Sequence, residues 1–92
     1  MSESNPLTSS LHSHRFVETH TGFVGYGLDR PTDEITLIYY LQKFSDDRLM
    51  ETLVPRMTDV EIEELFLLIN RLLRRHLREK EYHRLFLKSE QP

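Results

Sequence analysis

The stretch of sequence that decides the fold is residues 58–88, TDVEIEELFLLINRLLRRHLREKEYHRLFLK. It contains neither Pro nor Gly, and its apolar residues recur at steps of three and four, the spacing of an amphipathic helix. Thr58 followed by Glu61 is typical of a capping box, in which each side chain takes up a free backbone N–H of the first turn. The pattern predicts one long helix over about residues 59–87.

One face of this predicted helix is apolar when residues are placed at 100° steps. The helix would be about 45 Å long at ~1.5 Å per residue, whereas a compact chain of this size has a radius of gyration of ~12 Å. We therefore expect a second copy to cover part of the helix in an intertwined helical dimer. The face that serves as core and dimer contact comprises Ile62, Leu65, Phe66, Ile69, Leu72, Leu73 and His76, and it extends towards Leu77, His83 and Leu87.

Charge is segregated along the same helix. Residues 59–70 contain four acidic residues and no basic one, whereas residues 71–88 contain seven Lys and Arg and two Glu. In an antiparallel pair, the acidic cluster of one copy would lie near the arginines of the other. Complementary charge of this kind sets orientation and partner choice more than affinity.

Two shorter helices are predicted upstream, over about residues 33–44 and 46–54. Thr32 and Ser45 are the expected N-caps, each followed by acidic residues that favour a first turn, and Pro55 is expected to end the second helix. The sequence thus predicts an all-α fold, a small helical bundle in which two short helices pack on one long C-terminal helix within residues 32–88.

The N-terminal third has a different amino-acid composition. Residues 1–14 are rich in Ser, Thr, Asn and His and predict a flexible tail. Residues 15–31 hold every glycine of the chain among aromatic and β-branched residues, which predicts either an extended arm docked on the helices or a short hairpin.

Composition excludes several classes of protein. The 92 residues are enough for one domain. There is no Cys for disulfides or thiolate metal sites, no apolar run long enough to span a bilayer, and no signal-peptide pattern. We expect a cytoplasmic protein with no membrane association and no cofactor. The net charge of −3 disfavours general coating of nucleic acid, and the pattern has only the generic character of small bacterial-type helical proteins.

Four arginines form the most conspicuous candidate binding surface. They would line one side of the long helix and could bridge phosphates or bind another protein, although a solvated face that pairs with Glu, in the same chain or in the second copy, is the favoured explanation. A recognition helix for DNA is disfavoured because the helix begins with acidic residues, which phosphates repel. The four residues are Arg71, Arg74, Arg75 and Arg78.

Histidines supply a weak candidate metal site. His76 and His83 share a face but are about 10 Å apart along the axis, and Glu79 could join either of them. His12, His14 and His20 would bind metal only if their segment folded around it. We expect a partly buried His76 rather than a metal ligand.

The sequence contains no other catalytic or cofactor-binding motif. The glycines at 22, 25 and 27 lack the strand, helix and Lys-Ser/Thr of a phosphate loop, and the acidic residues sit at helix starts, where capping explains them. The sequence therefore predicts a non-catalytic regulatory or adaptor protein that acts through protein–protein interaction and self-associates through its long helix. The alternative is a nucleic-acid-binding regulator that uses the Arg71–Arg78 face.

Overall fold

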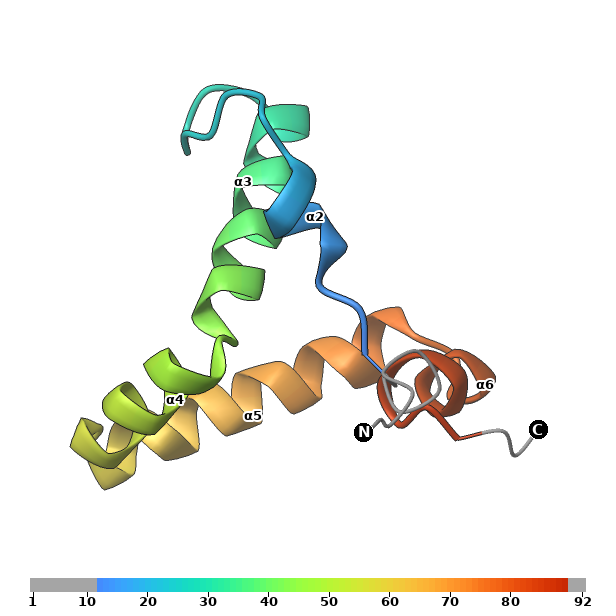
Figure 1. Cartoon of the computed structure of the whole chain (residues 1–92). Helices are drawn as coiled ribbons and strands as arrows, with labels where there is room; N and C mark the ends of the chain where they lie inside the picture. The colour runs from blue at the N-terminus through green and yellow to red at the C-terminus, as the bar shows by residue number, and fades with distance from the viewer. Residues whose placement is uncertain (1–11, 90–92) are drawn as a thin grey trace, which may run out of the picture. The chain divides into compact units, whose positions relative to one another are not determined.

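The computed structural model describes residues 12–89 (Figure 1). These residues are mostly helical and form no β-strand, which confirms the all-α prediction. The chain divides into two compact units, one of residues 13–56 and one that contains the residues from Met57 onward. All but the last three residues of the predicted tail, 1–14, lie outside the described residues.

The N-terminal unit is built on α3 (Arg30–Phe44), against which the short helix α2 (Arg15–Thr19) packs (Figure 1). The prediction of an extended arm or hairpin from residue 15 is wrong for these five residues. Phe16 and His20 are four residues apart, the distance at which side chains meet on a helix, and their rings stack with centroids 4.8 Å apart. The Val17 backbone N–H donates to the Gln42 side-chain oxygen and ties α2 to α3.

Irregular backbone follows α2 and is fixed to α3 by side chains rather than by strand pairing. The Thr36 hydroxyl accepts a hydrogen bond from the Gly25 N–H and donates one to the Gly25 carbonyl, both at 3.0 Å. Gly27 adopts a φ of 98°, in the left-handed region that favours glycine, and its N–H donates to Asp33. Thr36, only 4% exposed, is the only fully buried residue among those described.

The start of α3 corrects the predicted N-cap. Asp29, not Thr32, caps the helix, and its carboxylate accepts the Thr32 N–H at 2.8 Å. Pro31 does not delay the helix because the first-turn N–H that it lacks would have had no helical partner anyway. The hydrogen bonds from the backbone N–H and from the side chain of Thr32 hold the pKa of Asp29 below its ordinary value.

The second predicted helix is α4 (Asp47–Leu53), followed by a 3-10 turn, Val54–Arg56, that contains Pro55. Its cap is Asp46 rather than Ser45, because the Asp46 carboxylate reaches the N–H groups of both Arg48 and Leu49 at 3.1 Å. An ionised acceptor makes the stronger hydrogen bond, which explains the shift of one residue.

The C-terminal unit is built on α5 (Asp59–His76). The predicted capping box is confirmed: the Thr58 hydroxyl accepts the Glu61 N–H at 3.1 Å, and the Glu61 carboxylate accepts the Thr58 N–H at 2.9 Å. The start of this helix therefore has the residues and hydrogen bonds that the sequence predicted.

The prediction of a single helix over residues 59–87 is wrong. The α5 helix ends at His76, and the backbone of Leu77 and Arg78 is extended. A short turn, α6 (Glu79–Glu81), and a π-helical turn, Tyr82–Phe86, follow. The α5 helix is therefore about 27 Å long, not 45 Å.

Two features of the sequence explain the break. In a straight helix Tyr82, Leu85 and Phe86 would point about 120° to 160° away from Ile62, the first residue of the apolar face, so the break lets these side chains turn to a new direction. Glu81 also gives the Arg78 backbone N–H a partner in place of a helical carbonyl. Its carboxylate accepts a hydrogen bond from this N–H at 2.8 Å and one from the Arg78 guanidinium at 3.2 Å. The guanidinium bond lowers the pKa of Glu81.

No hydrophobic side chain is fully buried among the described residues. In the N-terminal unit, Leu37 and Leu41 lie one turn apart on α3 and are 57% and 55% exposed. The packing of the two shorter helices on α5 stays a prediction. No helix among residues 12–89 is both long and apolar enough to cross a bilayer.

The Thr36 clamp can be tested by replacing Thr36 with Val, which keeps the shape but removes both hydrogen bonds. We expect the Gly25 amide to exchange with solvent roughly five- to tenfold faster, as the loss of a hydrogen bond worth about 1 kcal/mol implies. Amide exchange measured by NMR checks this. Thr36→Ser retains the hydroxyl and should preserve the protection; equal exchange in both variants would contradict the clamp.

The Asp29 cap makes the start of α3 sensitive to acid. Because folding lowers the pKa of this carboxyl, its stabilisation is present above the ordinary Asp value of about 3.9 and is lost as the pH falls through the folded value. We expect the Thr32 amide to lose protection below about pH 4, as monitored by NMR. Asp29→Asn keeps a capping oxygen without a titrating group, so its Thr32 amide should respond little in that window.

Candidate interaction surface

The apolar side chains of α5 form the candidate interaction surface. Four of them follow a 4, 3, 4 spacing and define the α5 seam: Ile62, Phe66, Ile69 and Leu73. Phe66 is 64% exposed, Ile62 44% and Ile69 43%, whereas Leu73 is half-buried. Isolated exposed apolar residues are common on proteins, but a continuous row of them marks an interaction site.

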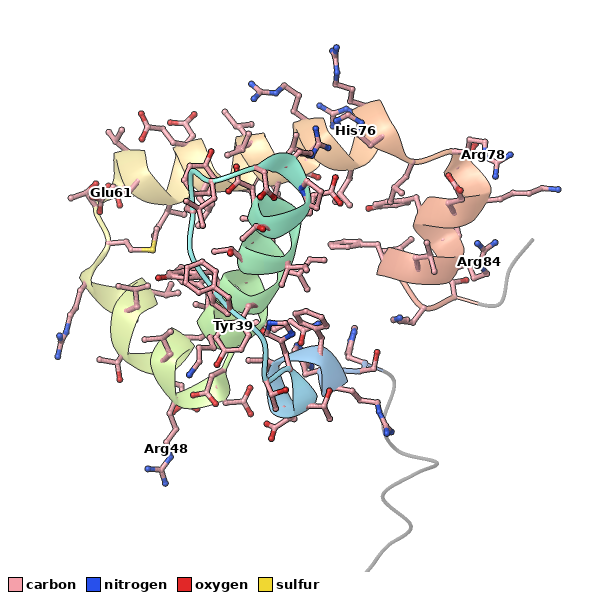
Figure 2. The ribbon with its side chains drawn as sticks, turned by 90° about the horizontal axis from the view of Figure 1, so that it is seen from above. Tyr39, Arg48, Glu61, His76, Arg78 and Arg84 are labelled. Atoms are coloured by element: carbon pink, nitrogen blue, oxygen red, sulfur yellow. The ribbon has the colours of Figure 1, made fainter. Side chains whose placement is uncertain are left out.

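The remaining predicted members of this face flank the seam. Leu72 and His76 are exposed, and Leu65 is half-buried. The partial burial of His76 in a dimer seam stays a prediction, because the ring is exposed in the single chain. It lies in the last turn of α5, where a ring nitrogen in water needs no partner from the protein (Figure 2).

Charge on α5 is divided as the sequence indicated. Asp59, Glu61, Glu63 and Glu64 occupy the first two turns, and Arg71, Arg74 and Arg75 the last two. The nearest acidic and basic residues, Glu64 and Arg71, are seven positions apart, about 10 Å along the axis. Pairs within a helix require a spacing of three or four, so these charges cannot neutralise one another within α5.

Partners for these charges are also missing among the other described residues of the C-terminal unit. The ion pairs found there are Arg78–Glu81 and His83–Glu79. Both lie outside α5. The acidic start and the basic end of this helix therefore both present unpaired charge on an exposed surface.

The predicted four-arginine stripe is interrupted. Arg71, Arg74 and Arg75 remain on α5 and are exposed, but Arg78 lies in the break after Leu77 and pairs with Glu81 at 3.2 Å (Figure 2). The change of backbone direction at the break removes Arg78 from the helical face. Only the three arginines of α5 remain as a basic cluster.

The bend between α5 and α6 encloses one side of an open hollow of about 470 Å³, here called the elbow hollow. Its lining combines apolar and polar residues. Tyr82 stacks on Phe86 with ring centroids 5.4 Å apart, and the Asn70 amide donates to the Phe66 carbonyl. The lining residues are Asn70, Leu73, Arg74, Leu77, Glu79 and Tyr82.

The predicted histidine site is not assembled. The His83 ring approaches the Glu79 carboxylate at 3.8 Å, but His76 lies on the other side of the break. Among residues 12–89, no three His, Cys, Asp or Glu side chains are grouped closely enough to hold a metal ion. His20, from the N-terminal histidines, instead packs between Phe16 and Tyr39, with one ring nitrogen buried and without a hydrogen bond.

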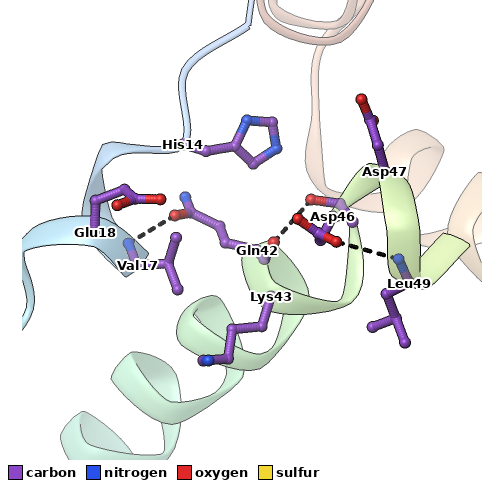
Figure 3. A pocket seen from close by; sticks show the side chains of 9 residues that line it. His14, Val17, Glu18, Gln42, Lys43, Asp46, Asp47 and Leu49 are labelled. Carbon is purple, nitrogen blue, oxygen red and sulfur yellow. Dashed lines mark hydrogen bonds between the residues drawn. The ribbon is translucent and has the colours of Figure 1, made fainter.

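A second hollow, of about 700 Å³, lies in the N-terminal unit where α2 meets the end of α3 and the start of α4 (Figure 3). Gln42 holds the Val17 N–H on one side, and Asp46 caps α4 on the other. Its lining mixes both signs of charge, and its main hydrogen bonds serve the fold. Sequence reasoning missed it because it depends on α2, which the four-residue spacing of Phe16 and His20 could have revealed. The lining residues are His14, Val17, Glu18, Gln42, Lys43, Ser45, Asp46, Asp47 and Leu49.

Four hydroxyl groups in the described chain have structural uses. A nucleophilic hydroxyl would need a neighbouring base within hydrogen-bonding reach. The hydroxyls of Thr19, Thr36, Ser45 and Thr52 instead each donate to a backbone carbonyl. These four groups cap or clamp the backbone.

Comparisons with protein-family models, with curated proteins and with solved structures found no match. The surface of α5 and its charges are therefore the basis for a functional assignment.

Proposed function

We propose that this protein is a non-catalytic interaction protein of regulatory or adaptor type that self-associates through α5. The observation that carries the proposal is the exposed α5 seam on a helix with unpaired acidic and basic ends. A second copy of the chain supplies both an apolar row and the opposite charges, so it fits this surface better than a partner of one charge.

The basis of the proposal differs from the argument that the sequence alone provides. A helix of about 45 Å would need cover because of its length, but α5 is about 27 Å long. The proposal now depends on the exposure of the apolar side chains of α5. Full burial of an aliphatic or aromatic side chain contributes about 1.5–3 kcal/mol, and Phe66 and Ile69 are 64% and 43% exposed in the single chain.

Phe66→Glu and Leu67→Glu form a matched pair of variants that tests self-association. Both replace an exposed apolar side chain of α5, 64% and 56% exposed, with the same charge, but only Phe66 belongs to the seam. We expect sedimentation at tens of micromolar to show a dimer for the native chain and for Leu67→Glu, and a monomer for Phe66→Glu. A monomeric native chain with full helicity would contradict the proposal.

The exposed Arg71, Arg74 and Arg75 favour a second candidate function, that of a nucleic-acid-binding regulator. If phosphates neutralise these side chains, affinity for DNA or RNA should fall steeply as salt rises. Arg74→Glu with Arg75→Glu should then abolish binding measured by fluorescence anisotropy. Absence of binding to both DNA and RNA at low salt would rule this function out, and Asp59, Glu61, Glu63 and Glu64 on the same helix disfavour it because they repel phosphates.

A further inference from the structure

We propose that two copies of α5 pair antiparallel in one register, centred between Leu67 and Leu68, and that Ile62 of each copy closes the elbow hollow of the other. This inference rests on the proposed self-association and specifies its geometry.

The spacing of the seam selects the register. When the midpoints of two antiparallel α5 helices coincide, Ile62 lies at the level of Leu73 of the second copy, and Phe66 at the level of Ile69. All four seam positions of each chain then face a seam position of the other. A shift by one heptad in either direction leaves only two of the four with such a partner, so the centred register covers the most apolar surface.

The flanking charges agree with the same register. In an antiparallel pair with two-fold symmetry, each flank of a helix faces the same flank of its partner. Glu63 and Arg74 lie on one flank of α5. Along the helix axis, Glu63 of one copy is about 3 Å from the level of Arg74 of the second copy. Glu61 and Arg75 do not form a second such pair, because Arg75 points away from the seam.

The elbow hollow lies at the end of this pairing. Its lining includes Leu73, which the register places opposite Ile62, and Arg74, which it places beside Glu63. Leu77 and Tyr82 extend the apolar lining beyond the end of α5. The hollow is open and mostly apolar in the single chain, and the partner's aliphatic side chain with its neighbouring carboxylate matches both the apolar and the polar lining residues.

Cross-linking tests the register directly because the chain contains no Cys. Ile62→Cys and Leu73→Cys are prepared separately, mixed and oxidised. We expect a mixed disulfide between the two variants, whereas each variant alone should link poorly because two copies of residue 62 lie about 16 Å apart in level, beyond the ~7 Å Cα limit for a disulfide. Leu67→Cys mixed with Leu68→Cys is the control: these positions share a level but point away from the seam.

A dimer that cross-links Ile62→Cys to itself in preference to Leu73→Cys would overturn the register and leave the proposed self-association intact. A native chain that sediments as a monomer would overturn both.

Charge reversal supplies a second measurement that does not touch the seam. Glu63→Arg and Arg74→Glu should each weaken dimerisation roughly tenfold at low salt, as two repulsive contacts per dimer imply. The double variant should recover the native affinity, because each charge again faces its opposite. Equal affinity of all four chains in sedimentation would overturn the inference.

Discussion

The structure depends on a constraint within α5: its hydrophobic residues and its two kinds of charge have no partners on the helix itself. Four acidic residues precede the apolar centre and three arginines follow it, too far apart for pairing along the helix. The seam is exposed at the same time. The proposed antiparallel second copy would cover the seam and neutralise the charges at the same time.

The sequence predicted what short-range chemistry determines. The capping box of Thr58 and Glu61 transferred because both members of the pair lie within one turn. The cap of α3 was misplaced because Thr32 and Asp29 both satisfy the capping preference, and only the structure shows that the carboxylate takes the N–H while Thr32 donates it. Likewise Asp46 prevailed over Ser45 because an ionised oxygen is the stronger acceptor.

The break at Leu77 was not predictable from helix propensity, since neither Leu nor Arg ends a helix by itself. The signal lay in the direction of the apolar residues: Tyr82, Leu85 and Phe86 belong to a different face from the seam. Counting only the residues that continued the first face, His83 and Leu87, concealed that change. The same error placed Arg78 in the arginine stripe and His76 on one helical face with His83. The predictions of the fold and of the candidate sites were therefore wrong for the same reason, the break at Leu77.

The exposed seam also has a thermodynamic consequence. The heat capacity of unfolding arises mainly from the hydration of apolar surface, and no described hydrophobic side chain is fully enclosed within a single chain. The isolated chain should thus have a flatter stability curve than a protein with an enclosed core. If the proposed dimer forms, most of the heat-capacity change would belong to the association of two copies, and cooling would weaken the assembly more than the helices from which it is made.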